Sequence, residues 1–224
     1  FLPSRTFLPG AASFDPPHGA GRTVILRSRF MRQIVLASTS PYRRELLERL
    51  GLPFTVAEPL FEERIDQDVE PAELVRNFAL GKALSLAAAF PDAVVIGSDQ
   101  VFVAGGEIVG KPGTAERAFE QLKRMSGGTH TFYTGLAAVD TASGENRISC
   151  VPFSVTLRDL TDDEIRNYIR RENPLNCAGA FMIEGLGIAL MERLEGADFT
   201  ALIGLPLIEL VTMLRMLGIN PLGS

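Results

Sequence analysis

Polar residues suited to phosphate chemistry follow the first regular apolar segment of the chain. Ser38-Thr-Ser-Pro-Tyr-Arg-Arg44 lies between a predicted strand and a predicted helix. Backbone N–H groups at a helix start, hydroxyl groups and guanidinium groups together suit phosphate binding. A simple helix N-cap followed by exposed arginines is the alternative. No Gly-Lys-Ser/Thr follows, so this is not a Walker loop.

An acidic residue stands at the end of a second apolar segment. Gly97-Ser98-Asp99-Gln100 follows the strand predicted at residues 93–97, and we interpret residues 98–100 as the loop at its carboxyl end. Ligands of open α/β sheets bind at such ends. Asp99 is therefore a candidate base or metal ligand, with a turn-forming aspartate as the alternative.

Two lysines have local surroundings that could direct an ammonium group. Lys111 stands between Gly110 and Pro112, which restrict the backbone on both sides. It either points at a phosphate or is a solvated loop residue. Lys82 lies in an otherwise apolar helix, where it either extends its ammonium to solvent or points into a cleft.

Acidic residues mark two further segments. Glu184 lies in the glycine-rich segment 178–187, where glycines permit close approach of the backbone to a ligand; an exposed turn is the alternative. Glu63 belongs to an acidic group that is either a solvated loop or part of a Mg²⁺ site. The members of that group are Glu62, Glu63, Asp66 and Asp68.

The elements that must position these residues follow from apolar periodicity and from turn and cap residues. Strands are predicted at 33–37, 93–97, 131–139 and 148–157, and a hairpin around Gly105-Gly106. Helices are predicted at 41–50, 71–86, 114–125, 161–171 and 205–217. In the second helix the expected buried stripe is Leu74, Val75, Phe78, Leu84 and Leu86. Strands that alternate with helices, with antiparallel pieces between them, indicate an α/β fold with a mixed sheet.

Composition excludes several classes of protein. The 224 residues are 46% hydrophobic and 22% charged, which is typical of a globular protein. No apolar run approaches the roughly 18 residues of a membrane span. The formal charge of −5 argues against a nucleic-acid polymer as partner. Two cysteines and two histidines without metal-type spacing suit a reducing cytoplasm, where we expect the protein to work.

Residues 1–30 differ from the rest of the chain. They contain four prolines, three glycines and one acidic residue, without periodicity. We interpret them as a disordered leader or a non-native extension, and residues 31–224 as a single domain.

Taken together, the quoted segments resemble the Maf family of nucleotide pyrophosphatases over about residues 32–222. No single motif is decisive, but the ordered set is specific. The matching segments are Leu36–Arg44, Ile96–Gln100, Gly110–Pro112, Phe132–Gly135, Ala178-Gly179, Glu184-Gly185 and Gly204–Pro206.

The resemblance implies a mixed, bent central sheet flanked by helices, two lobes around a nucleotide cleft, and a possible homodimer. Inosine triphosphate pyrophosphatases share this architecture. It also implies hydrolysis of a nucleoside triphosphate to the monophosphate and pyrophosphate. The small nucleotide would be the partner, with no membrane and no nucleic-acid polymer.

Roles for individual residues follow from the same resemblance and from the chemistry. Asp99 would take the proton of the attacking water, and Glu63 would help to hold a divalent ion, Mg²⁺ or Mn²⁺. The phosphates would be bound by Ser38, Arg43, Lys82 and Lys111.

Three positions resemble the subgroup that acts on 7-methyl-GTP. They are Tyr42, Gln100 and Glu184, where members acting on dTTP and UTP have Arg, Thr and Gln. Tyr42 departs from the usual Trp of this subgroup but is still aromatic. Two other functions stay open: an inosine/xanthosine triphosphate pyrophosphatase, and a nucleotide-binding regulator of septum formation without significant turnover.

Overall fold

The computed structural model describes residues 32–65 and 68–223. The leader predicted at residues 1–30 lies outside this part, as does Asp66 of the acidic group, and the proposed domain boundary stays a prediction. Among the described residues, no helix has the length and apolar character needed to cross a membrane.

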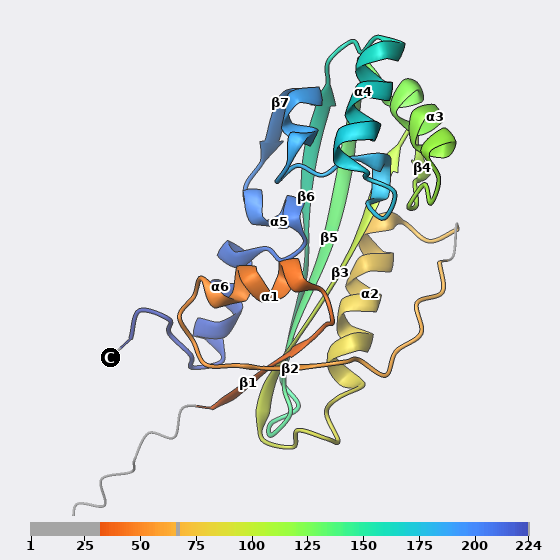
Figure 1. Ribbon diagram of the computed structural model, residues 1–224. Helices are drawn as coiled ribbons and strands as arrows, with labels where there is room; N and C mark the ends of the chain where they lie inside the picture. The colour runs from red at the N-terminus through yellow and green to blue at the C-terminus, as the bar shows by residue number, and fades with distance from the viewer. Residues whose placement is uncertain (1–31, 66–67, 224) are drawn as a thin grey trace, which may run out of the picture. The chain divides into compact units, whose positions relative to one another are not determined.

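A seven-stranded mixed sheet forms the centre of the fold (Figure 1). Its order is β2-β1-β3-β5-β6-β7, and β4 pairs with β3. Strand β1 is parallel to β2 and β3, and the other pairs are antiparallel, so the predicted mixed α/β fold is confirmed. The strands are β1 Gln33–Ala37, β2 Thr55–Ala57, β3 Ala93–Ala104, β4 Glu107–Ile108, β5 Thr129–Asp140, β6 Asn146–Leu157 and β7 Met191–Gly196.

Six α-helices and two 3-10 turns surround the described sheet. The α-helices are α1 Pro41–Glu48, α2 Pro71–Leu84, α3 Ala115–Met125, α4 Asp162–Glu172, α5 Phe199–Ile203 and α6 Leu207–Met216. The 3-10 turns are η1 Ala178–Ala180 and η2 Leu186–Leu190. Thr161 and Glu164 form a capping box at the start of α4, and the side chains of Ser40 and Thr114 cap α1 and α3.

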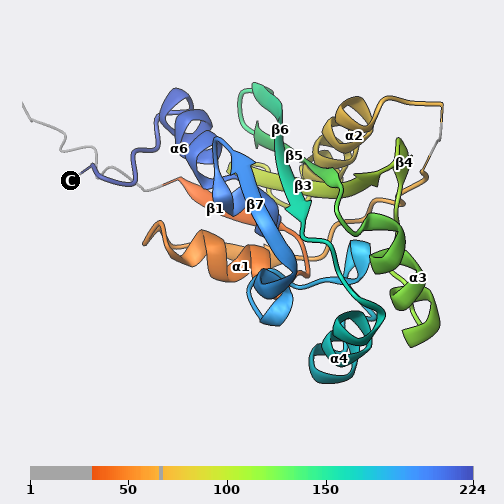
Figure 2. The same ribbon diagram turned by 90° about the horizontal axis from the view of Figure 1, so that it is seen from above.

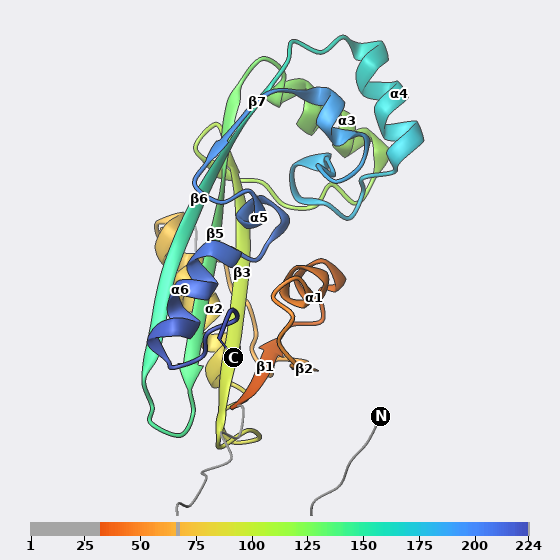
Figure 3. The ribbon, with the colours of Figure 1, turned by 90° about the vertical axis from the view of Figure 1, so that its left-hand side faces the viewer.

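Alternation along the strands separates the apolar contacts of the two faces. Ile96 of β3 packs in a cluster with α1 and α6, whereas its neighbour Val95 packs in a cluster with α2. Farther along β3, Phe102 joins a third cluster with α3 and α4. Figure 3 shows α1 and α6 at one end of the long strands and α3 and α4 at the other, which agrees with two helical lobes.

Two glycines allow α2 to lie directly against the sheet. A Cβ atom at Gly97 or at Gly135 would lie 2.0 Å from the carbonyl oxygen of Ala79 or of Val75, respectively. Side chains there would push α2 away from β3 and β5. This close packing directs the buried face of α2, including Lys82, toward β3.

Two details of the predicted elements were wrong. Residues 98–100 are not a loop, because β3 continues through them, paired with β5 from Val94 to Val103. Leu84 is 48% exposed, because the buried stripe of α2 follows positions 74, 75, 78, 79, 82 and 83. Strands β2 and β7 and helix α5 were not predicted, and the last helix begins at Leu207 rather than at 205.

An ion pair joins the beginning of β1 to the end of β5. Asp140 is buried and accepts hydrogen bonds from both terminal nitrogens of Arg32 and from the backbone N–H groups of Ala142 and Ser143. These bonds, with that of Arg32 the largest, hold the pKa of the Asp140 carboxyl far below its usual range. The charged form of Asp140 therefore stabilises the folded state.

Asp140→Asn is expected to lower the free energy of unfolding by about 1–3 kcal/mol at neutral pH. Because the pKa of Asp140 is depressed in the folded state, its contribution is present above the unfolded-state pKa of about 3.9 and is lost as pH falls. The difference between the two proteins should shrink on acidification. Urea unfolding from neutral pH to the lowest pH with a cooperative transition measures this, with the exposed Glu107→Gln as control. A pH-independent difference would contradict the explanation.

Candidate active site

One cavity of about 640 Å³ brings together all nine side chains to which the resemblance gave a role, although Arg44, Glu62 and Asp68 do not line it. This volume suits a small-molecule ligand. The predicted residues in its lining are Ser38, Tyr42, Arg43, Glu63, Lys82, Asp99, Gln100, Lys111 and Glu184.

The cavity lies where β3 extends beyond its neighbour β1. Strand β1 ends at Ala37, opposite Gly97, and β4 joins β3 only from Val103 onward. Between these points the edge of β3 is open, and Ser98, Asp99 and Gln100 occupy it. The rule that ligands bind at the carboxyl end of a parallel strand therefore predicts a ligand position at the end of β1 rather than at that of β3.

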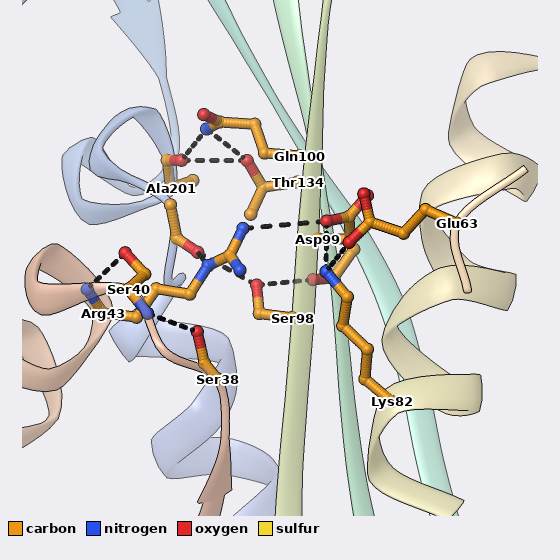
Figure 4. A network of polar contacts seen from close by, with 12 residues as sticks. Ser38, Ser40, Arg43, Glu63, Lys82, Ser98, Asp99, Gln100, Thr134 and Ala201 are labelled. Carbon is orange, nitrogen blue, oxygen red and sulfur yellow. Dashed lines mark hydrogen bonds and ion pairs between the residues drawn. The ribbon is translucent and has the colours of Figure 1, made fainter. Parts of the chain in front are cut away.

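Asp99 lies at the centre of a group of charges drawn from both sides of β3 (Figure 4). Its Oδ1 is 2.6 Å from Lys82 Nζ and 3.9 Å from Arg43 Nη2. Glu63 Oε1 lies 2.5 Å from the same Lys82 Nζ. Lys82 thus points into the cavity rather than to solvent, which decides between the two interpretations of this residue.

Burial and charge act in opposite directions on Asp99. Only 7% of this residue is exposed, and burial raises the pKa of its carboxyl above the ordinary value, while Lys82 and Arg43 oppose the increase. Burial also lowers the pKa of Arg43, although a guanidinium keeps its charge in proteins. The result is a desolvated carboxyl group held between two cations.

The guanidinium of Arg43 is oriented by the segment that follows α5. Its Nε donates to the carbonyl oxygen of Gly204 at 2.9 Å, which leaves the terminal nitrogens directed at the cavity (Figure 4). Ser98 Oγ donates to the same carbonyl oxygen at 2.9 Å. Gly204 therefore fixes the direction of the Arg43 side chain, although the two residues are 161 positions apart in the sequence.

The start of α1 forms one wall of the cavity. Ser38 is buried, and its Oγ accepts a hydrogen bond from the backbone N–H of Ser40 at 3.1 Å. The Ser40 hydroxyl in turn accepts from the N–H of Arg43. The cavity lining includes residues 37–43, so the positive end of the α1 dipole faces it.

Lys111 is exposed and lies in a loop whose backbone is fixed on both sides. The N–H of Val109 donates to Phe102 O at 2.8 Å, and the N–H of Gly113 donates to Leu175 O at 3.0 Å. The lysine is thereby held at the cavity while its ammonium stays in solvent.

Tyr42 and Glu184, both exposed, also line the cavity. The hydroxyl of Tyr42 donates to Sδ of Met182, another lining residue, at 3.6 Å. Cys177, for which the sequence suggested no role at the site, lines the cavity as well.

The amide of Gln100 is fixed by a network that sequence reasoning missed (Figure 4). Its Nε2 donates to Thr134 Oγ1, Ala201 O and Leu202 O, and Thr134 Oγ1 itself donates to Ala201 O. All three partners of Nε2 act as acceptors, so Gln100 has only its Oε1, an acceptor, to offer to a ligand. Helix α5, which carries two of these acceptors, has only five residues and is too short to show the apolar periodicity that predicts a helix from sequence.

Two carboxylates, Glu63 and Asp99, are available to a divalent ion. Among residues 32–65 and 68–223, no group of three or more His, Cys, Asp or Glu side chains could hold a metal ion. Mg²⁺ is commonly bound by one or two carboxylates together with substrate phosphates and water. The donor set therefore fits an ion that arrives with a triphosphate better than one bound by protein ligands alone.

The sequence of this chain is similar to those of known proteins. A protein from Syntrophotalea carbinolica named 7-methyl-GTP pyrophosphatase is 57% identical over 195 residues, which cover 87% of this chain and 99% of that protein. The solved structure of the Staphylococcus aureus Ham1 protein has a TM-score of 0.39 and 17% identity, covering 57% of this chain and 73% of that chain. The model of the Maf-like protein family matches residues 33–217, and the chain belongs to this family.

Proposed function

We propose that this protein hydrolyses 7-methyl-GTP to 7-methyl-GMP and pyrophosphate. The observation that carries the proposal is the buried carboxyl group of Asp99, held between Lys82 and Arg43 in a cavity that Glu184 also lines. The name of the Syntrophotalea carbinolica relative supports the same activity and substrate.

In the proposed reaction, a water molecule attacks phosphorus, and the anhydride bond between the α- and β-phosphates breaks. Both cations near Asp99 approach its Oδ1, so Oδ2 is the candidate acceptor for the proton of the water. Pyrophosphate leaves with the electron pair of the broken bond. Arg43, Lys82 and Lys111 stabilise the negative charge of the phosphates, and the Ser38 hydroxyl and the start of α1 add hydrogen-bond donors.

We propose Glu63 as a protein ligand of a divalent ion, Mg²⁺ or Mn²⁺, whose other ligands would be substrate phosphates and water. When bound, the ion neutralises phosphate charge and lowers the pKa of coordinated water. Lys82 Nζ lies against the carboxylates of both Glu63 and Asp99, and this convergence on one cation supports the proposal. On substrate binding, the ammonium would turn from the carboxylates to a phosphate oxygen.

The base would be recognised by acceptors and by an aromatic face. Guanine presents N1–H and N2–H on one edge, and the Glu184 carboxylate accepts both, whereas glutamine offers one acceptor oxygen. Gln100 offers only its Oε1, which also suits a donor-rich base. Methylation at N7 makes guanine cationic, and a cation over the ring of Tyr42 gains about 0.5–2 kcal/mol.

This arrangement favours 7-methyl-GTP over the two alternatives. Hypoxanthine and xanthine lack the 2-amino group, so an inosine or xanthosine triphosphate pyrophosphatase gains less from Glu184. A regulator without turnover has no need of a buried carboxyl group between phosphate-binding cations. Cytoplasmic location and a homodimer stay predictions.

Glu184→Gln is expected to lower kcat/KM for 7-methyl-GTP by at least about tenfold, because an unpaired donor costs about 1–3 kcal/mol when it is desolvated. The value of kcat/KM for UTP, whose base presents a mixed donor and acceptor edge, should fall little or rise. The measurement is kcat/KM for 7-methyl-GTP, GTP, ITP, UTP and dTTP with the wild type and the variant.

Tyr42→Ala serves as the matched variant on the other side of the base. It should reduce the difference in kcat/KM between 7-methyl-GTP and GTP, since only the methylated base is cationic. A wild-type preference for dTTP or UTP would reject the proposed substrate, and a preference for ITP would select the first alternative. Absence of pyrophosphate release with every nucleotide, with and without Mg²⁺, would reject the enzyme and favour the regulator.

A further inference from the structure

The segment that carries Glu184 is fastened to helix α4 at two backbone positions. Tyr168 Oη accepts a hydrogen bond from the N–H of Met182 at 3.0 Å. Glu172 Oε2 accepts one from the N–H of Leu186 at 2.8 Å. Met182 and Leu186 each lie two residues from Glu184, so the two bonds hold the chain symmetrically about it.

Both acceptors belong to one face of α4. Tyr168 and Glu172 are four residues apart, a spacing that places their side chains one helical turn apart on the same side. Tyr168 is 3% exposed, and burial raises the pKa of its hydroxyl, which is therefore neutral.

The position of Glu172 is unfavourable for the helix itself. It lies in the last turn of α4, where the helix dipole favours cations and disfavours a carboxylate. Its contact with the 181–187 segment is close: a Cβ atom at Gly185 would lie 2.2 Å from Glu172 Oε1. The Glu172 carboxylate thus holds this segment in place, although its charge destabilises the last turn of α4.

Side-chain burial alternates along the fastened segment. Phe181 and Ile183 are buried in the apolar cluster that includes α4, while Glu184 is exposed at the cavity. The apolar side chains anchor the segment to the core. The hydrogen bonds from the N–H groups of Met182 and Leu186 fix the direction of the backbone on either side of Glu184, which apolar packing does not do.

We propose that Tyr168 and Glu172 are positioning residues for base recognition, because they set the orientation of Glu184 through the N–H groups of Met182 and Leu186. This inference rests on the proposed function in one respect: Glu184 must contact the base. Neither residue lines the cavity, so neither is expected to touch the nucleotide.

Tyr168→Phe removes the hydroxyl acceptor and keeps the buried ring. We expect it to lower the ratio of kcat/KM for 7-methyl-GTP to kcat/KM for UTP by about three- to tenfold, the effect of one hydrogen bond. The change should arise in KM for 7-methyl-GTP, with kcat nearly unchanged, since the phosphate-binding residues lie on other elements. A residue that only stabilises the fold would affect both nucleotides equally.

Glu172 supplies a second, independent pair of variants. Glu172→Ala removes the acceptor and should reduce the same ratio, whereas Glu172→Gln keeps an acceptor oxygen and should restore most of it. Arg170→Ala, an exposed change on the same helix, is the control: it removes a bond to Asn167 and one of the two cations of the last turn, but no contact with the 181–187 segment, and should leave the ratio unchanged.

A double-mutant comparison separates this inference from the proposed function. If Tyr168 and Glu172 act through Glu184, Tyr168→Phe and Glu172→Ala should have little effect on the ratio in the Glu184→Gln background. An unchanged ratio in both single variants, or effects that add fully to that of Glu184→Gln, would overturn the inference alone. If Glu184→Gln itself leaves the ratio unchanged, Glu184 does not read the base, and the inference falls together with that part of the proposed function.

Discussion

Asp99→Asn is expected to lower kcat for nucleotide hydrolysis by about 10²–10⁴-fold, the typical contribution of a general base. Asparagine keeps the size of the side chain, but its amide does not accept the proton of the attacking water. The pocket keeps Arg43 and Lys111, so nucleotide should still bind. The measurements are kcat for 7-methyl-GTP and the dissociation constant of a non-hydrolysable analogue.

The pH dependence of the wild type tests the same assignment. A base must be unprotonated to act, so activity should fall as pH decreases through the pKa of Asp99. Since burial raises that pKa in the nucleotide-free protein, the acidic limb of the kcat/KM profile, which reports groups of the free enzyme, should lie above the ordinary value for aspartate, 3.8. The residual activity of Asp99→Asn should lack this limb.

Asp163→Asn provides the matched control, because the Asp163 side chain is 92% exposed on α4. It should leave both kcat and the acidic limb unchanged. Near-normal turnover in Asp99→Asn, or an unchanged acidic limb, would remove Asp99 from the role of base.

The sequence predicted best where chemistry and local structure share a signal. The helix predicted at 41–50 begins in the same few residues that supply Ser38 and Arg43, and Ser40 and Pro41 are typical of such a helix start. Segments that carried the resemblance also converge on one cavity, although they lie far apart in the chain. Their roles stay predictions until variants are measured.

What the sequence could not predict depends on contacts between distant segments. The extension of β3 through Ser98–Gln100 is stabilised by pairing with β5, and turn-forming residues masked it. The exposed position of Leu84 depends on which face of α2 meets the sheet, which Gly97 and Gly135 determine.

Hydrogen bonds between a side chain and a distant backbone group leave no local pattern in the amino-acid sequence. Gly204 O accepts from Arg43, and the Met182 and Leu186 N–H groups donate to α4. In each case one partner is a backbone group, which every residue type supplies except for the proline N–H. Such positioning contacts can be found only once the fold is known.

Arg43→Ala is the second change with a large expected effect, a decrease in kcat/KM for 7-methyl-GTP of about 10²–10³-fold, as for the loss of one preorganised donor to developing negative charge. Folding should be affected much less. The carbonyl oxygen of Gly204, which loses its bond to Arg43 Nε, still accepts a bond from Ser98 Oγ.

Arg43→Lys should recover only part of this loss. The guanidinium of Arg43 donates through Nε to Gly204 O while its terminal nitrogens stay directed at the cavity. A single ammonium group does not make both contacts in that fixed geometry. If charge alone mattered, lysine would restore nearly full activity, and the orientation by Gly204 would be unimportant.

Arg44→Ala is the matched control, since the two arginines are neighbours on the same helix. Its side chain is 63% exposed and forms an i,i+4 pair with Glu48 at 3.0 Å, away from the cavity lining. Such a pair contributes about 0.3–0.5 kcal/mol, so the variant should keep both stability and activity. Steady-state kinetics and thermal unfolding of the three variants decide the matter: an Arg43→Ala protein that loses stability but keeps its activity would make Arg43 a structural residue, held by Gly204 and Asp99 for the sake of the fold rather than for the phosphates.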